Sequence, residues 1–240
     1  MSREVSNNEA RDAIMQSIRA HLAASPRLES ASVSLIPHDD TGANYQPATG
    51  ASDLKMFCER LESVGGHCVI VRDEDEAARA LARIVSELQA RDGASRIALS
   101  DAALVSRLTR DVAAEQLEVC PQVSDLFSYD AGVTMAQAGI AETGTLILEA
   151  EKERHRLVSL LPPVHIAVVR AQDICPTIGD ALKRLRGDGE SGMSRAITFI
   201  TGPSRTADIE LTLTIGVHGP KELHVIVMDS EPEAKNVLRR

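Results

Sequence analysis

The sequence predicts an α/β fold, built as an open, mostly parallel sheet with helices on both faces. Short apolar runs of strand length alternate with helical segments, at the spacing of parallel βαβ units. Aromatic residues make up 2% of the 240 residues and Trp is absent. Ala, Val, Ile and Leu must therefore fill the core, as is typical of helices packed on a buried sheet.

The first 50 residues are expected to form an N-terminal helix and a linker, followed by the α/β domain at residues 51–240. Ile14, Ile18 and Leu22 recur at four-residue spacing, which predicts a short amphipathic helix over residues 8–24. Residues 25–50 are rich in Ser, Pro, Gly, Asp and Asn, which favours a linker or a long surface loop.

The first half of the domain is expected to alternate helices with short strands, of which residues 68–71 are expected to be buried. A helix begins near Ser52 and ends at the Gly65-Gly66 pair. Asp73 caps the next helix, and Glu76 completes a capping-box pattern. A third helix covers about residues 101–111. The strands predicted between and after these helices are residues 68–71, 97–99 and 117–119.

The second half is predicted to contain more strands and one helix, at about residues 177–185. Its apolar runs lie at residues 145–149, 164–170, 197–200 and 223–228. Residues 208–217 alternate apolar and polar side chains, and this period of two favours a strand over a helix.

Charge and composition exclude several classes of partner. The net charge is −9 at pH 7, with no basic stripe interleaved with aromatic residues, so nucleic acid is not expected as a partner. No apolar run approaches the roughly 20 residues that span a bilayer. Residues 1–10 lack the apolar core of a signal peptide. We expect a cytoplasmic protein with no membrane span.

Metal and cofactor motifs are missing from the sequence. None of the four cysteines forms a Cys-x-x-Cys pair, so iron–sulfur and zinc spacings are absent. We expect these cysteines to be reduced thiols in a cytosolic core. Histidine pairs with metal-binding spacing are also absent, and no glycine-rich dinucleotide motif follows a strand. The predicted metal content is none.

A polar loop at residues 201–210 is the first candidate site. It follows the apolar run 197–200, and an α/β fold usually binds its ligand where a core strand ends in a loop. Its candidate ligand-binding residues are Gly202, Ser204, Arg205, Thr206 and Glu210. The turn frees backbone N–H groups and the arginine can grip a carboxylate or phosphate. The alternative is a tight turn whose hydroxyls bond nearby backbone.

The candidates for catalysis are Glu142, Asp208 and His218, whereas Glu210 is a candidate ligand-binding residue. Asp208 and Glu210 share one face of the predicted strand, where they hold a proton, a cation or Arg205, or are simply solvated. Glu142 precedes a buried strand and is a candidate nucleophile or base. The alternative is a carboxylate that bonds nearby backbone.

The residues around Glu142 and the histidines complete the set of candidates. Thr143, Gly144 and Thr145 flank Glu142 and are candidate ligand-binding residues. His218 lies in a Gly-Val-His-Gly-Pro turn and is the histidine most suited to function. His165 and His224, at strand starts, are expected to be structural.

Three blocks of sequence together resemble the lactate-utilisation (LUD) domain family, over about residues 52–229. They are AGIAETGT at 138–145, SLLPPVH at 159–165, and TGPSRTADIE at 201–210 with the following GVHGP and LHV. The resemblance implies a fold similar to the NagB/RpiA/CoA-transferase group. It also implies a role in oxidising L-lactate to pyruvate within a three-component system, whose iron–sulfur clusters belong to two partner proteins.

The resemblance and the residues together suggest two functions. The first is a component of an iron–sulfur L-lactate-oxidising system that has no cofactor of its own. It binds a small carboxylate or phosphate, or a partner subunit. The alternative is a stand-alone enzyme acting on a CoA-linked or phosphorylated small molecule, with Glu142 as nucleophile or base.

Overall fold

The computed structural model describes residues 12–17, 19–20, 51–93, 95–150, 156–186, 194–207, 213–216 and 218–229. The chain divides into two units, Met1–Gln46 and Pro47–Arg240. In the first unit, residues 12–17 and 19–20 are helical and exposed. The remainder of the predicted 8–24 helix and the linker lie outside the described residues.

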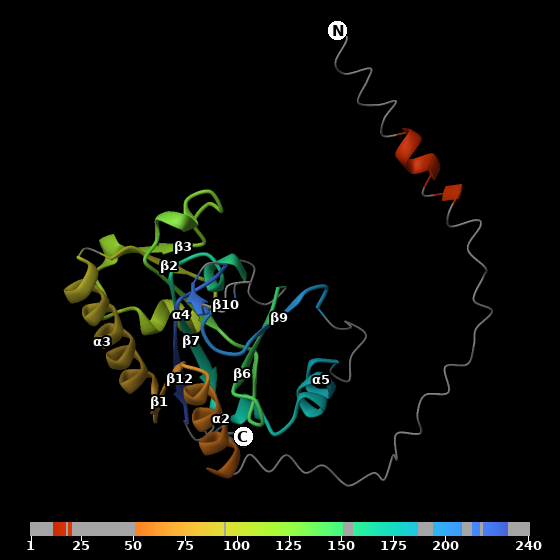
Figure 1. The fold of residues 1–240 in the computed structure, drawn as a ribbon. Coiled ribbons are helices and arrows are strands. Elements are labelled where there is room, and N and C mark those ends of the chain that lie inside the picture. Colours follow the sequence, from red (N-terminus) through yellow and green to blue (C-terminus); the bar gives the residue numbers. More distant parts are fainter. Residues whose placement is uncertain are drawn as a thin grey trace, which may run out of the picture. The chain divides into compact units, whose positions relative to one another are not determined.

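A six-stranded sheet forms the centre of the second unit, with the order β1-β12-β7-β4-β2-β3. Every pairing between neighbours in this order is parallel. The strands are β1 (His67–Val71), β2 (Ile97–Leu99), β3 (Leu117–Val119), β4 (Ala131–Met135), β7 (Val164–Arg170) and β12 (Glu222–Met228). The predicted open, parallel sheet is confirmed (Figure 1).

Helices cover both faces of this sheet, as predicted. On one face lie α3 (Glu74–Asp92) and α4 (Ala103–Leu108), whose buried side chains share a core with those of β2 and β4. On the other face lies α2 (Ala51–Ser63), whose Phe57 and Leu61 are fully buried against β7 and β12. Each such buried side chain stabilises the fold by about 1.5–3 kcal/mol.

A second sheet of four strands, which the sequence analysis did not separate from the first, packs on the α2 side. Its order is β8-β5-β6-β9, and it includes Leu146 and Leu148 in the core that α2 shares with β7. The strands are β5 (Ala138–Ile140), β6 (Thr145–Glu149), β8 (Ile174–Cys175) and β9 (Ile197–Ile200). Helix α5 (Ile178–Arg186) packs on it through Ala181 and Leu185.

A short hairpin follows β9 and corrects part of the loop prediction. Strands β10 (Arg205–Ala207) and β11 (Leu213–Ile215) pair antiparallel, with Arg205 opposite Ile215. Residues 205–207 are therefore strand, where the sequence analysis expected loop. Of the strand predicted over residues 208–217, residues 213–215 are confirmed, while residues 208–212 and 217 lie outside the described residues.

Two predicted elements differ from the structure. The strand at residues 68–71 is buried only in part, at Val71, because β1 lies at the edge of the sheet. Val69 is 37% exposed and Ile70 is 48% exposed. The helix predicted over residues 101–111 is shorter, since α4 covers only Ala103–Leu108. An apolar run alone does not reveal whether a strand is central or at an edge.

Cys58 of α2 and Cys68 of β1 form a disulfide, with Cα atoms 5.6 Å apart. The prediction of four reduced thiols is therefore wrong. Gly65 adopts a φ of 87° and lets the chain turn sharply from α2 into β1, which brings the two cysteines together. Cys120 and Cys175 remain thiols, and burial raises the pKa of the Cys175 thiol.

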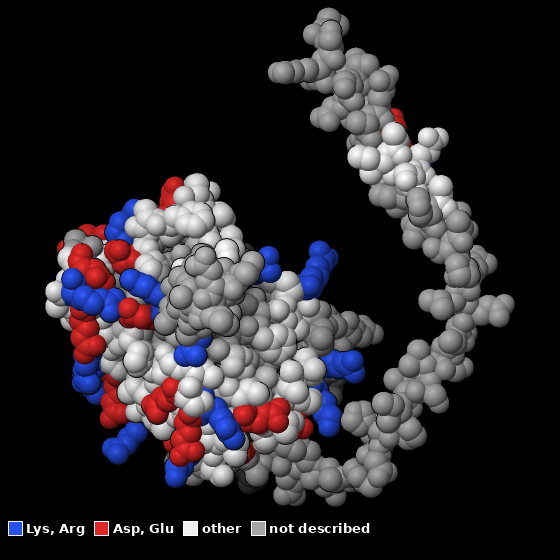
Figure 2. Space-filling model, in the orientation of Figure 1, with Lys and Arg blue, Asp and Glu red and all other residues white. Residues whose placement is uncertain are grey.

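The charged surface carries both signs. On the face shown in Figure 2, basic and acidic side chains are intermixed over the described residues, and neither sign gathers into one broad patch. Ion pairs such as Arg107 with Glu74 join α4 to α3. In the part of the chain that the structure describes, no helix is both long and apolar enough to cross a membrane.

Candidate functional site

A cavity of about 180 Å³ lies at the amino ends of β7 and β12. Its walls come from the end of the 3₁₀ helix η3 (Arg156–Ser159), from β9, and from the two loops at residues 201–204 and 218–220. Ligands of parallel α/β sheets usually bind at the opposite, carboxyl edge. This cavity lies instead at the amino edge, where β9 of the second sheet and the loop after β9 pack beside β7 and β12 of the first sheet.

This position corrects the setting expected for the polar loop. The sequence analysis placed the loop after a core strand of the parallel sheet. Strand β9 is instead the half-buried edge strand of the second sheet. The loop still contributes to the cavity, because Gly202 and Ser204 line it together with His218 of the turn before β12.

His165 is a deeply buried polar residue of the cavity wall. It is 1% exposed, and its Nε2 lies 2.8 Å from Oγ1 of the buried Thr134 on β4. Its Nδ1 is buried with no hydrogen-bond partner among the described residues. Burial lowers the pKa of His165 to about 3, so the imidazole is neutral near pH 7.

The sequence analysis expected His165 to be structural, because it lies at a strand start. The signal that identifies it is the pattern of β7, where His165 interrupts a strand that is otherwise apolar up to Arg170. A buried polar atom without a partner requires an explanation, and a ligand in the adjoining cavity supplies one.

Three threonine hydroxyls form a chain that ends at the cavity. Oγ1 of Thr145 lies 2.7 Å from Oγ1 of Thr143 and 2.7 Å from Oγ1 of Thr201. Thr145 is buried, Thr143 is exposed, and Thr201 lines the cavity. The candidates Thr143 and Thr145 therefore do not line the cavity themselves. Thr145 bonds the hydroxyl of Thr201 directly, and Thr143 bonds that of Thr145.

Ser204 is held in the cavity wall by its backbone. Its N–H donates to the carbonyl of Pro220 at 2.8 Å, and its carbonyl accepts from the N–H of Gly216 at 2.9 Å. These bonds fasten the loop after β9 to the turn before β12. Ser204 and His218 therefore come from two loops that are bonded to each other, and both residues line the cavity.

The structure places Glu142 away from this cavity, at the start of α5. Its Oε1 accepts a hydrogen bond of 2.8 Å from the backbone N–H of Ile178. A carboxylate at a helix N-terminus is stabilised by the unpaired N–H groups and by the helix dipole. The alternative expected from the sequence was a bond to nearby backbone, whereas the backbone group that Glu142 accepts from belongs to a helix 36 residues further along the chain.

Gly144 and Gly202 lie at turns whose backbone packs closely against the C-terminal end of α2. Gly144 has a φ of 65°, and a Cβ there would lie 2.7 Å from the Cα of Leu61 in α2. Gly202 has a φ of 86°, and a Cβ there would lie 2.9 Å from Cγ2 of Val64. Both candidates thus let a turn approach the end of α2, and only Gly202 lines the cavity.

Arg205, the cation expected to hold an anion, turns to the C-terminal end of α2. Its Nη2 donates to the carbonyl of Val64. Unpaired carbonyls and the helix dipole favour a cation at this position. Arg205 is exposed and is not among the residues of the cavity wall.

Replacing Arg205 with Ala is therefore expected to lower stability. The loss of one charge-assisted hydrogen bond at an exposed position predicts a decrease of about 1 kcal/mol in the free energy of unfolding. Urea unfolding measures it, with Arg79→Ala on the exposed face of α3 as control. Equal stability of the two variants would contradict the assigned contact.

The remaining candidates fall outside what the structure describes. Asp208 and Glu210 lie outside the described residues, and so does the side chain of Thr206. Among the described residues, no group of three or more His, Cys, Asp or Glu side chains is arranged to hold a metal ion.

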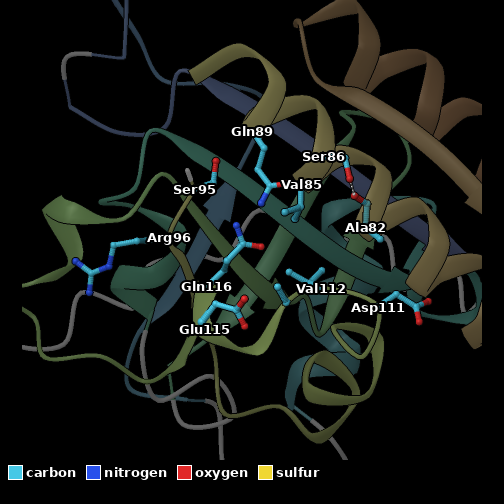
Figure 3. Close-up of a pocket in the computed structure, with 11 residues that line it drawn as sticks. Ala82, Val85, Ser86, Gln89, Ser95, Arg96, Asp111, Val112, Glu115 and Gln116 are labelled. Atoms are coloured by element: carbon cyan, nitrogen blue, oxygen red, sulfur yellow. Dashed lines mark hydrogen bonds between the residues drawn. The ribbon is translucent and has the colours of Figure 1, made fainter. Parts of the chain in front are cut away.

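A larger cavity, of about 480 Å³, lies between α3 and the segment before β3. Figure 3 shows the amides of Gln89 and Gln116 and the carboxylate of Glu115 around it. Arg96 extends away from these side chains in the view, and it donates to Ser128 Oγ and to Tyr129 OH, at 2.7 and 3.1 Å. The wall thus offers amides and carboxylates, while the guanidinium of its Arg96 is bonded to Ser128 and Tyr129.

Comparison with known proteins gives a consistent picture. Residues 54–228 match the family model of the LUD domain. Lactate utilization protein C of Geobacillus thermodenitrificans is 30% identical over 247 residues, which cover 91% of this chain and 96% of that protein. Lactate utilization protein C of Bacillus subtilis is 41% identical over 101 residues, or 41% of this chain and 42% of that protein.

Other alignments are shorter, and one solved structure is similar. The match to lactate utilization protein C of Oceanobacillus iheyensis, 36% identical, spans 44% of that protein, so the chain aligns with under half of its length. The crystal structure of a DUF162 family protein from Deinococcus radiodurans has a TM-score of 0.55 and 25% identity, covering 74% of this chain and 97% of that one.

Proposed function

Since the chain belongs to the LUD domain family, we propose that it acts in lactate utilisation, as one component of an iron–sulfur L-lactate-oxidising system. In this proposal the chain has no redox centre of its own. Two partner proteins hold the clusters and accept the two electrons released when L-lactate becomes pyruvate. The system works in the cytoplasm.

The observation that carries the proposal is the cavity beside β7 and β12. It brings a buried neutral imidazole, hydroxyl groups and an apolar wall into one small space. Cavities that bind small molecules combine an apolar lining with a few placed polar groups. The names of the relatives support lactate utilisation as the process.

The sequence supports the assignment of the iron–sulfur clusters to the partner proteins. None of the cysteines has the spacing of an iron–sulfur motif. Two of the four are joined in the disulfide between α2 and β1, which removes them as thiolate ligands. Electron transfer is therefore assigned to partners, and ligand handling to this chain.

The test is L-lactate-dependent reduction of a dye by the two iron–sulfur partners, with and without this chain. We expect the rate to fall at least about tenfold without the chain, equivalent to 1.4 kcal/mol in the barrier. Glu142→Gln keeps an oxygen that accepts from Ile178 N–H, so this variant is expected to retain the activity of the wild type.

Two results would contradict the proposal. Equal lactate oxidation by the partners alone would remove this chain from the reaction. Loss of activity in Glu142→Gln, with unchanged stability, would instead favour an enzyme that uses Glu142 as nucleophile or base.

A further inference from the structure

The cavity wall has a polar side and an apolar side. The polar side is formed by His165, Thr201, Ser204 and His218. Within it, Nδ1 of His165 is a buried atom with no hydrogen-bond partner among the described residues. The apolar side is formed by Leu160, Phe199, Ile200 and Leu223. A ligand that fills this space needs oxygen atoms at one end and a short hydrocarbon group at the other.

The charge of the wall limits the ligand further. The described residues that line the cavity include no Lys or Arg, because Arg205 turns to the end of α2. Phosphate groups are usually held by Arg, Lys or a helix N-terminus. Uncharged donors match one carboxylate better than a phosphate, which carries more negative charge.

The size of the cavity also favours a small carboxylic acid. Sites for drug-sized ligands occupy about 300–1,000 Å³, whereas this cavity has about 180 Å³. The nucleotide part of a CoA ester would exceed it. A three-carbon acid is of suitable size.

We propose that this cavity binds a short monocarboxylic acid with an oxygen at its second carbon, a 2-hydroxy or 2-oxo acid, and that His165 Nδ1 bonds an oxygen of that acid directly. The inference rests on the proposed function for the choice between lactate and other acids of this class. The apolar wall takes the methyl group, and Thr201 and Ser204 bond the remaining oxygen atoms.

His165 acts here as a neutral hydrogen-bonding group and not as a base. A neutral imidazole has one N–H donor and one acceptor nitrogen. When Thr134 donates its hydroxyl proton to Nε2, the proton of the ring lies on Nδ1 and points to a carboxylate oxygen. The lowered pKa of His165 supports this assignment, because a group that resists protonation near pH 7 is a poor proton acceptor.

The cavity can be narrowed without changing His165. A Cβ at Gly219 would lie 3.1 Å from Cβ of Ser204 and 3.4 Å from its Oγ, so Gly219→Ala pushes against Ser204. Gly179→Ala is the matched control, because a Cβ there meets only Oγ1 of Thr177, at 3.6 Å. A third variant, Thr134→Val, keeps the shape of the side chain and removes the hydroxyl that orients His165.

The experiment is calorimetric titration of the isolated full-length chain with L-lactate, pyruvate, inorganic phosphate and acetyl-CoA. We expect one of the two acids to bind with a Kd of about 1 mM or tighter. Binding is expected to weaken roughly tenfold in Gly219→Ala and in Thr134→Val, which corresponds to one hydrogen bond. Gly179→Ala is expected to bind like the wild type.

A spectroscopic measurement accompanies the titration. In ¹⁵N-histidine NMR spectra, the two ring nitrogens of His165 are expected to show a single neutral tautomer, and the Nδ1 resonance is expected to shift when the acid binds. A signal of His165 that does not respond to the bound acid would overturn the direct contact.

The outcomes separate this inference from the proposed function. If neither acid binds, or if binding is unchanged in Gly219→Ala and Thr134→Val, the cavity assignment is wrong. Tighter binding of phosphate or acetyl-CoA at the cavity would also overturn it. In each case the chain can still be required for lactate oxidation by its partners, and the dye-reduction assay decides that separately.

Discussion

Gly144→Ala is expected to destabilise the protein by about 2–5 kcal/mol. A residue with a Cβ at positive φ costs about 1–2 kcal/mol, and inserting atoms into a packed region adds about 1–3 kcal/mol. At Gly144 the φ is 65°, and the added Cβ would overlap the backbone of Arg60 and Leu61. Because backbone atoms cannot rotate away, α2 must move from the sheet or the turn must distort.

Gly93→Ala separates the two causes. Gly93 has a φ of 92°, but nothing lies within 4 Å of a Cβ built there. This variant therefore measures the backbone cost alone, about 1–3 kcal/mol. Guanidinium unfolding of both variants measures the difference. Equal destabilisation would show that the close approach of Gly144 to α2 contributes nothing.

The second large effect is a loss of stability in mild acid, caused by His165. Its pKa in the folded state is lowered from 6.5 to about 3 by burial. Above pH 6.5 both folded and unfolded states hold the neutral ring. Below it the unfolded state binds a proton that the folded state excludes, so stability falls as the pH falls.

The size of this effect follows from the shift. Each pH unit between 6.5 and 3 removes up to 1.36 kcal/mol, so about 2 kcal/mol is lost by pH 5. His224 adds to the slope in the same direction, since burial is the main cause that lowers its pKa. The pKa of Glu74 is also lowered, chiefly by its hydrogen bond to Arg107, and it contributes only at lower pH, as that carboxylate becomes protonated.

Urea unfolding at a series of pH values from 7.5 to 5 tests the prediction. We expect His165→Gln to flatten the profile. If His165→Gln does not fold, an NMR titration of the wild-type ring gives a second readout. A His165 resonance that titrates near pH 6.5 would refute the assignment.

Local patterns were enough to predict much of the fold. The capping box at the start of α3 is present in part. Asp73, the N-cap residue, accepts from the N–H of Glu76 at 2.7 Å, while Glu76 accepts from the N–H of Arg72, one residue before the cap, at 2.9 Å. The helix that begins near Ser52 and the glycine turn after it were also predicted correctly. Such features depend on neighbours within a few residues, so the sequence contains the whole interaction.

The candidate residues chosen from the sequence occupy different places in the structure. Gly202, Ser204 and His218 line the cavity, as their place in polar turns suggested. Arg205 and Glu142 were singled out for their charge, yet each bonds the end of a helix. A charged group next to a strand has many possible partners, and the helix ends that attract these two are remote in the sequence.

What the sequence by itself determined was the family, the parallel α/β class and most of the helices and strands, because periodicity and composition are local properties. Only the tertiary structure decided which sheet each strand joins, that Cys58 pairs with Cys68, and that His165 lies at a cavity. The reason is that these contacts join residues far apart in the chain. The hydroxyls of Thr145 and Thr201, for example, are hydrogen-bonded although 56 residues separate them. Burial and contacts across such separations exist only once the sheets have packed.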